Sequence, residues 1–161
     1  MSLSTNKIRV LMVCLGNICR SPTAEAMLRK KAHDLGLQRR IEVDSAGTAD
    51  YHVDSPPDRR AIAHGERRGL QMKQLRGRQV QAADFDRFDF ILAMDEDNLA
   101  NLRKLQPAGS RADVALLMSF APQAGSAEVP DPYYGGADDF EHVLDLVDAA
   151  ASGFIASQVS N

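Results

Sequence analysis

The chain has 161 residues, a length that suits one domain with a single hydrophobic core. Hydrophobic residues make up 44% of the sequence and charged residues 25%, which are ordinary values for a globular protein. The formal net charge is −3, and no apolar stretch approaches the roughly 20 residues of a membrane-spanning helix, so neither nucleic-acid binding nor a membrane anchor is expected.

Residues 1–6 lack the apolar core of a signal peptide, and we expect them to be disordered or to be a remnant of cloning. Cys14 and Cys19 are the only cysteines, too few and too close in sequence for a disulfide framework. An unpaired thiol and the lack of a signal sequence together predict a location in the reducing cytoplasm.

Apolar and amphipathic segments alternate along the first half of the chain. Residues 8–13 are apolar at nearly every position, which predicts a buried strand of a parallel sheet. A helix is predicted over about 23–35, with Gly36 after it as a stop. A short second strand is predicted over 41–44, followed by a turn at 45–48.

The second half continues this alternation, although the segment 71–81 gives no clear indication of secondary structure. The pattern predicts a loop over 49–58, a helix from Pro57 to Gly65 or Gly69, a strand over 88–94, a helix over 97–105, a strand over 114–118 and a loop over 120–136. The final helix has an apolar face with a period of 3.6 residues, formed by Phe140, Val143, Leu144, Val147, Ala151, Phe154 and Ile155.

Strands that alternate with helices predict an α/β fold. We expect one domain over residues 1–161, with an open parallel four-stranded sheet in the order 2-1-3-4 and helices on both faces. The crossovers between parallel strands should be right-handed.

The chemistry of the chain is concentrated in residues 14–22, between the first strand and the first helix. Backbone N–H groups converge in such a loop, and the helix dipole adds positive potential. The loop is therefore predicted to form a phosphate cup, in which phosphate or sulfate would bind. The residues expected to bind phosphate in this cup are Leu15, Gly16, Asn17, Ile18 and Cys19.

Cys14 is the predicted nucleophile, because thiolates form at helix N-termini and beside cations. Arg20 offers a planar fork that matches two oxygens of a phosphoryl group. Asn17 tolerates the left-handed backbone region and can lock the loop, and Ser21 can donate a hydrogen bond to the sulfur. The alternative for Cys14 is a small buried hydrophobic residue, but its place before the helix and the arginine six residues later favour the nucleophile.

Asp131 lies between Pro130 and Pro132 in the long loop and is the candidate general acid. A basic leaving group departs poorly unless it is protonated. A phenolate is an example, since its conjugate acid has a pKa of about 10. The resulting carboxylate could then deprotonate the water that hydrolyses a cysteinyl-phosphate. Since Asp-Pro is also a common turn pair, spacing alone leaves a turn aspartate as the alternative.

Cys-x5-Arg-Ser is the phosphate loop of protein tyrosine phosphatases, and residues 13–25 resemble its form in the low-molecular-weight branch. Further matches follow in the same order over nearly the whole chain, at residues 44–48, 56–61, 93–99 and 129–134. The resemblance implies hydrolysis of phosphotyrosine and other aryl phosphate monoesters through a cysteinyl-phosphate, without a metal or another cofactor. It favours Asp131 as the general acid and implies a contact between Asn17 and Ser45.

Tyr51, Tyr133 and Tyr134 are candidate walls of an aryl slot above the phosphate cup, with Leu15 and Ile18 as its apolar rim. The depth of such a slot would select phosphotyrosine over the shorter phosphoserine. Loop tyrosines are ordinarily half-buried packing residues, but the resemblance favours the slot. Ile18 argues against phosphoarginine as substrate, because related enzymes for that substrate carry a smaller polar residue there.

The chain departs from the family pattern at residues 71–81, where family members often carry a histidine that supports the phosphate loop. No histidine is present in this segment, and Gln74 is near the expected place. Cys19 has two interpretations: it could trap an oxidised Cys14 as a disulfide, or it could be a buried structural thiol.

Asp95 and Asn98 are interpreted as structural residues. The four histidines lie in different segments, and their spacing does not indicate a metal site: His33, His52, His64 and His142.

Two other functions are weaker interpretations. A thioredoxin-linked arsenate reductase would need two further cysteines downstream, and a non-catalytic phosphotyrosine-binding module is disfavoured by the joint presence of Cys14, Arg20 and Asp131. The expected partners are phosphotyrosine-containing proteins or small aryl phosphates. The expected state is a monomer, with a weak dimer as the alternative.

Overall fold

Four parallel strands form the centre of the molecule. The computed structural model describes residues 7–159, so the expectation for residues 1–6 concerns a segment outside the described residues. The strands are paired in the order β2-β1-β3-β4, with β1 (Ile8–Cys14), β2 (Ile41–Gly47), β3 (Phe90–Ala93) and β4 (Asp113–Leu116). The predicted α/β class and strand order are therefore confirmed.

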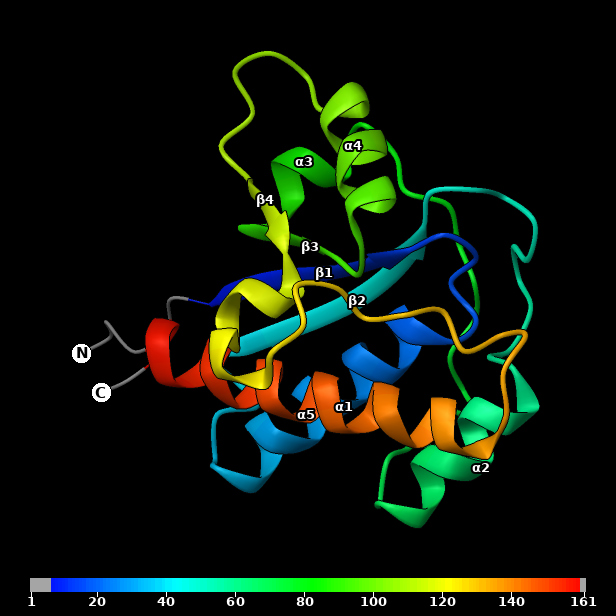
Figure 1. Cartoon of the computed structure of the whole chain (residues 1–161). Helices are drawn as coiled ribbons and strands as arrows, with labels where there is room; N and C mark the ends of the chain where they lie inside the picture. Colours follow the sequence, from blue (N-terminus) through cyan, green and yellow to red (C-terminus); the bar gives the residue numbers. More distant parts are fainter. Residues whose placement is uncertain (1–6, 160–161) are drawn as a thin grey trace.

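Helices cover both faces of this sheet (Figure 1). One face carries α1 (Arg20–Asp34), α2 (Arg59–Arg67) and α5 (Ala137–Gln158), and the other carries α3 (Asp84–Arg87) and α4 (Glu96–Leu105). Two short 3-10 helices follow β4, namely η2 (Leu117–Phe120) and η3 (Pro122–Ala124). Among residues 7–159, no helix is both long enough and apolar enough to span a membrane.

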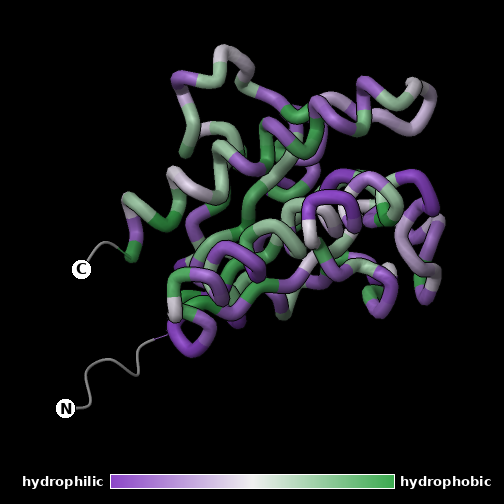
Figure 2. The backbone as a smooth tube through the Cα atoms, turned by 90° about the horizontal axis from the view of Figure 1, so that it is seen from below, coloured by the Kyte–Doolittle hydropathy of each residue, from purple (hydrophilic) through white to green (hydrophobic). Residues whose placement is uncertain are grey.

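The central strand β1 separates two apolar clusters, because its side chains alternate between the two faces of the sheet. Val10 and Met12 pack with residues of α1 and α5, whereas Leu11 and Val13 pack with residues of α3 and α4. Figure 2 shows hydrophobic residues in green along the central strands and hydrophilic residues in purple in the outer turns. The strand order turns at β1, and ligands of open α/β sheets bind at the carboxyl end of such a strand.

Several element boundaries differ from the sequence-based predictions. The second strand continues beyond residues 41–44, because β2 stays in register with β1 as far as the pair Cys14 and Gly47. Ser45 is therefore a buried strand residue and not part of a turn. The strand predicted over 88–94 is shortened to β3, since the unpredicted helix α3 ends just before it, and β4 is cut short by η2.

Asp58 caps the N-terminus of α2, and its replacement by alanine is expected to lower the free energy of unfolding by about 0.5–2 kcal/mol. Its carboxylate accepts hydrogen bonds from the backbone N–H of Arg60 at 2.8 Å and from the Arg60 side chain at 3.0 and 3.1 Å. Burial opposes ionisation of Asp58, but these bonds outweigh it and hold its pKa below the ordinary value. The stabilisation from this charge is therefore present above the unfolded-state pKa of about 4 and is lost as pH falls below it.

Asp58→Asn provides the matched variant, because asparagine keeps the capping acceptor Oδ1 and removes the charge together with the Oδ2 acceptor of Arg60 Nη2. Urea denaturation at pH 7 should place Asp58→Asn between the wild type and Asp58→Ala. The difference between the wild type and Asp58→Asn should shrink as pH is lowered from about 5 to 3. A difference that does not change with pH would contradict the assignment of this stabilisation to the charge.

Candidate active site

Hydrogen bonds from neighbouring segments to its carbonyl groups hold the loop between β1 and α1 in place. The carbonyl oxygens of Leu15 and Ile18 accept hydrogen bonds from the backbone N–H groups of Ala49 at 3.0 Å and Asp58 at 2.8 Å. A Cβ atom built on Gly47 would lie 2.7 Å from the Leu15 oxygen, so the close approach of β2 requires glycine at this position. These contacts fix the curvature of the predicted phosphate cup.

Two hydrogen-bond donors point at the sulfur atom of Cys14. Cys14 is the last residue of β1 and is 3% exposed. The backbone N–H of Asn17 lies 3.3 Å from this sulfur, and the Ser21 hydroxyl oxygen lies 3.1 Å from it. Asn17 has a φ of 58°, so it adopts the left-handed conformation that the sequence predicted. Hydrogen bonds of this kind stabilise a negative charge on sulfur.

The Asn17 side chain joins the sulfur to a buried polar network. Its Nδ2 donates to the Ser21 hydroxyl at 2.8 Å and to the Ser45 hydroxyl at 2.9 Å. Since Ser21 accepts this bond, its own proton can be donated to the Cys14 sulfur at 3.1 Å, which is nearer than its other acceptor, the Ala46 oxygen at 3.5 Å. The contact between Asn17 and Ser45 that the family resemblance implied is present in the structure.

Glu25 completes the network and was not predicted as a site residue, although it belongs to the quoted string at residues 13–25. Its carboxylate accepts hydrogen bonds from the Ser45 hydroxyl at 2.5 Å and from Arg29 at 2.6 Å. Burial raises the pKa of Glu25 despite these two bonds. The available signal was its place one turn after Ser21, on the same face of the helix that follows the loop.

Gln74 takes no part in this network among the described contacts. Its side chain is exposed and donates to the backbone oxygen of Gln71 at 3.2 Å. The support that segment 71–81 gives to the loop comes instead from the backbone N–H of Arg78, which donates to Asn17 Oδ1 at 3.0 Å. The position near which the family histidine was expected is therefore separate from the position that contacts the loop.

Arg20 is fixed beside the loop by groups from two other segments. Its Nη1 atom donates to Asp95 at 2.6 Å and to the backbone oxygen of Val129 at 3.0 Å. Burial disfavours the Arg20 cation, but the Cys14 sulfur and Asp95 outweigh burial and raise its pKa. Both bonds use Nη1, so Arg20 can use its Nε and Nη2 atoms to bind two oxygens of a phosphoryl group.

Asp95 has a functional position that the sequence analysis missed, since it orients Arg20 as well as capping α4. As a cap it accepts a hydrogen bond from the backbone N–H of Asn98 at 2.8 Å, which agrees with the structural interpretation. The available signal was its position directly after β3, because the carboxyl ends of parallel strands meet at one edge of the sheet.

The acid loop, defined here as residues 129–136, brings Asp131 to the same edge of the sheet. Asp131 Oδ2 lies 3.9 Å from Arg20 Nη2, and Oδ1 accepts a hydrogen bond from the backbone N–H of Tyr133 at 3.0 Å. Its side chain is 45% exposed. The backbone N–H of Val129 donates to the oxygen of Met94 at 2.8 Å, which fixes the start of the loop beside the end of β3.

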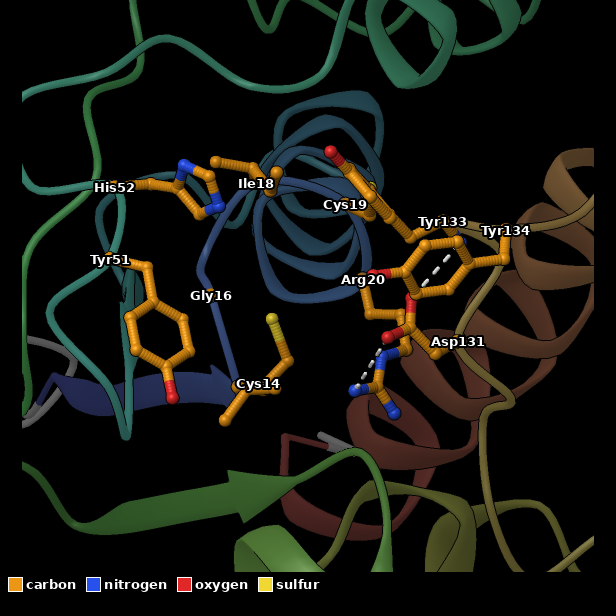
Figure 3. Close-up of a pocket in the computed structure, with 11 residues that line it drawn as sticks. Cys14, Gly16, Ile18, Cys19, Arg20, Tyr51, His52, Asp131, Tyr133 and Tyr134 are labelled. Carbon is orange, nitrogen blue, oxygen red and sulfur yellow. Dashed lines mark hydrogen bonds and ion pairs between the residues drawn. The ribbon is translucent and has the colours of Figure 1, made fainter.

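A cavity of about 290 Å³ joins these groups (Figure 3). Figure 3 shows the Cys14 sulfur between Tyr51 and His52 on one side and Asp131, Tyr133 and Tyr134 on the other. The cavity is lined by the predicted nucleophile, arginine, acid and slot residues together with His52: Cys14, Leu15, Gly16, Ile18, Cys19, Arg20, Tyr51, His52, Asp131, Tyr133 and Tyr134.

His52 is a lining residue that the sequence analysis did not predict. A Cβ atom on Gly16 would lie 3.1 Å from the His52 ring, so this ring packs directly on the loop. Its signal in the sequence was its place after β2, next to Tyr51. Tyr51 and Tyr134 are more exposed than an ordinary packing residue would be, at 71% and 94%, whereas Tyr133 is 39% exposed.

Cys19 also borders the cavity, but the residue is only 5% exposed. Burial raises the pKa of its thiol, and the nearby Asp58 and Cys14 raise it further. A buried thiol with a raised pKa is a weaker nucleophile, and both interpretations of Cys19, as a redox partner and as a structural thiol, stay predictions.

Within residues 7–159, no group of three or more His, Cys, Asp and Glu side chains is arranged to hold a metal ion. His64 is an example of a histidine in a packing role. Its ring contacts Glu141 at 2.5 Å and stacks on Phe140, with a distance of 5.6 Å between ring centroids.

Comparisons with known proteins find the same family over most of the chain. Residues 9–161 match the family described as low molecular weight phosphotyrosine protein phosphatase. The putative low molecular weight protein-tyrosine-phosphatase slr0328 of Synechocystis sp. is 45% identical over 151 residues, which cover 93% of this chain and 96% of that protein.

Solved structures of phosphatases are similar to this chain as well. The protein tyrosine phosphatase of Entamoeba histolytica with Hepes in its active site has a TM-score of 0.89 and 38% identity, covering 94% of this chain and 96% of that one. The Drosophila arginine phosphatase DARP has a TM-score of 0.89 and 32% identity, covering 96% of this chain and 99% of that one. On the family match and these similarities, the chain belongs to the low molecular weight phosphotyrosine protein phosphatase family.

Proposed function

We propose that the chain hydrolyses phosphotyrosine and other aryl phosphate monoesters in two steps, with Cys14, Arg20 and Asp131 as its catalytic residues. The observation that carries this assignment is the shared cavity, in which the Cys14 sulfur, the Arg20 guanidinium and the Asp131 carboxyl group line one space. Family membership supports the reaction class, and the geometry supports the assignment of each role.

In the first step, the Cys14 thiolate attacks the phosphorus atom and the bond to the phenolic oxygen breaks. Arg20 and the backbone N–H groups of residues 15–19 bind the equatorial oxygens, whose charge they stabilise as the phosphoryl group transfers. Protonated Asp131 gives its proton to the leaving phenolate, and the phosphoryl group remains on sulfur.

In the second step, the Asp131 carboxylate takes a proton from water as the water attacks the cysteinyl-phosphate. The bond between sulfur and phosphorus breaks, inorganic phosphate forms, and the Cys14 thiolate and protonated Asp131 are restored. Ser21 stabilises the leaving sulfur, because its hydroxyl lies 3.1 Å from that atom. Asn17 and Ser45 support this hydroxyl through the buried network.

The proposed specificity follows from the depth of the cavity. Cys14 is 3% exposed, whereas the candidate wall residues Tyr51, Tyr133 and Tyr134 reach the surface at the opposite end of the same cavity. A planar aryl group between these walls, with Leu15 and Ile18 at the rim, would span this depth. A serine ester is shorter and would leave its phosphoryl group above the sulfur.

We expect turnover of p-nitrophenyl phosphate and of a phosphotyrosine peptide in excess EDTA, with a kcat/KM at least about 10²-fold above that for the matched phosphoserine peptide. Phosphoarginine is the informative third substrate, because one structural neighbour is an arginine phosphatase. Since Ile18 makes the rim of the cavity apolar, we expect phosphoarginine to be the poorer substrate. Equal rates on phosphoserine, or loss of turnover in EDTA, would contradict the proposal.

Location and assembly belong to the same proposal. Cys14 and Cys19 are both free thiols, which supports a reducing compartment such as the cytoplasm. A monomer is the proposed state, and the exposed rings of Tyr51 and Tyr134 offer a surface for a weak dimer. Phosphate or sulfate is proposed to bind in the phosphate cup.

A further inference from the structure

The acid loop has few fixed points. Its first residue, Val129, is bonded to Met94, and its last residue precedes α5. Between these ends, residues 130–135 have no helix or strand. Pro132 is buried and the Asp131 carboxylate lies 3.9 Å from Arg20 Nη2, but Asp131 and Tyr133 are both substantially exposed. A general acid must nevertheless be held near its productive position, because a displacement of about 1 Å can cost up to 10²-fold in rate.

One hydrogen bond ties the middle of the acid loop to another part of the described chain. The Nη2 atom of Arg60, at the start of α2, donates to the backbone oxygen of Tyr133 at 2.9 Å. The backbone N–H of Tyr133 in turn donates to the Asp131 carboxylate at 3.0 Å. We propose that Arg60 is a positioning residue that holds Asp131, the proposed general acid, in place through Tyr133.

Arg60 is itself anchored to rigid elements. Its side chain is bonded to Asp58 by Nε at 3.1 Å and by Nη2 at 3.0 Å, in the fork geometry that limits its freedom. The guanidinium also lies over the Phe140 ring, 4.7 Å from the centroid, and Phe140 is a 3% exposed residue in the first turn of α5. Arg60 therefore connects the acid loop to α2 and α5 at once.

The same guanidinium lies 5.5 Å from the centroid of the Tyr133 ring. That ring is a wall of the cavity and contacts the Tyr134 ring edge-on, with centroids 4.9 Å apart. Loss of Arg60 would release both the backbone and the ring of Tyr133. The expected consequence is a less well placed acid together with a looser aryl wall.

The test uses two leaving groups, because the need for a general acid is greater when the leaving phenolate is more basic. The parameter is kcat/KM, which covers the steps up to departure of the phenol. In Arg60→Gln, we expect kcat/KM to fall about tenfold or more for phenyl phosphate and only about twofold for p-nitrophenyl phosphate. Arg60→Lys should resemble Arg60→Gln, since lysine lacks the planar fork that bonds Asp58 and Tyr133 together.

Arg59→Gln is the matched control: it removes the same charge one position earlier, from an exposed side chain without a hydrogen bond or ion pair to the described residues. It should leave both kcat/KM values unchanged. Equal losses on the two substrates in Arg60→Gln, or no loss on either, would overturn the proposal.

A second measurement separates positioning from a general loss of structure. In an Asp131→Asn background, no acid remains to be positioned, so Arg60→Gln should change the ratio of the two kcat/KM values by less than about twofold. An undiminished change in that ratio would overturn the proposal. The inference depends on the proposed role of Asp131, and the two can fail separately: a wild type without turnover refutes the proposed function, whereas an active wild type with an unaffected Arg60→Gln refutes only the role of Arg60.

Discussion

Cys14→Ser is expected to lower the turnover of p-nitrophenyl phosphate by at least about 10³-fold. The side chains are nearly equal in shape, so the contacts of β1 and of the loop should be kept. What is lost is the anionic sulfur to which Asn17 N–H and the Ser21 hydroxyl point, since a hydroxyl is far less readily ionised than a thiol. Without that anion, the first step lacks a nucleophile.

Steady-state turnover and the initial burst of p-nitrophenol measure this loss, and binding of inorganic phosphate shows whether the cup is intact. Phosphate should still bind to Cys14→Ser, because Arg20 and the backbone of the loop are unchanged. Cys19→Ser is the comparison variant: it also exchanges a sulfur for an oxygen, but at a thiol whose pKa is raised by burial. It should lose far less turnover than Cys14→Ser, and wild-type rates in Cys14→Ser would refute the mechanism.

The features that the sequence predicted best, the first strand and the loop after it, depend on residues close together in the chain. The apolar run at residues 8–13 is typical of a buried strand, and the loop after it combines a thiol, a glycine, an asparagine and an arginine at fixed spacing. Strand order then follows, because parallel strands with intervening helices allow few topologies. Cys14 and Arg20 are close in sequence, so their meeting in one loop required little tertiary information.

Partners that meet from distant segments could not be predicted in this way. Asp95 lies 75 positions from Arg20, and Arg60 lies 73 positions from Tyr133. Each of these residues also has an ordinary local role, Asp95 as the cap of α4 and Arg60 as part of the first turn of α2. The local role is sufficient to explain the residue type, so the sequence gives no reason to look for a second contact.

The extent of β2 illustrates a different limit. Ser45, Ala46 and Gly47 are small residues that resemble a turn, yet they continue the strand because the neighbouring β1 extends to Cys14 and offers its backbone groups. Ser45 thereby points into the protein, where its hydroxyl bonds both Asn17 and Glu25. Strand length was therefore set by the partner strand and not by the propensities of these residues.

Asp131→Asn is expected to lower kcat/KM for phenyl phosphate by about 10²- to 10⁴-fold. Asparagine has nearly the same shape, and its side-chain oxygen can still accept the bond from the Tyr133 N–H that holds the acid in the cavity. An amide has no proton that it can give to a phenolate, so the leaving group departs as the anion. The loss should be smaller for p-nitrophenyl phosphate, whose leaving group needs protonation less.

The leaving group supplies the second readout. In Asp131→Asn, the loss of kcat/KM should grow as the conjugate acid of the leaving phenolate becomes weaker, because an unprotonated leaving group departs less readily. Asp138→Asn is the matched control, because it makes the same change at an exposed residue seven positions later that has no hydrogen bond or ion pair to the described residues. It should keep both the rate and the wild-type dependence on the leaving group.

Hydrolysis of the intermediate tests the other half of the role of Asp131. The residue that protonates the phenolate also deprotonates the attacking water, so Asp131→Asn should slow the breakdown of the cysteinyl-phosphate as well. With p-nitrophenyl phosphate, whose first step is affected less, the intermediate should then accumulate on Cys14 and be detectable by mass spectrometry after acid quenching. If the variant slowed both substrates equally, Asp131 would be a structural turn residue, and another group in the cavity would have to supply the proton.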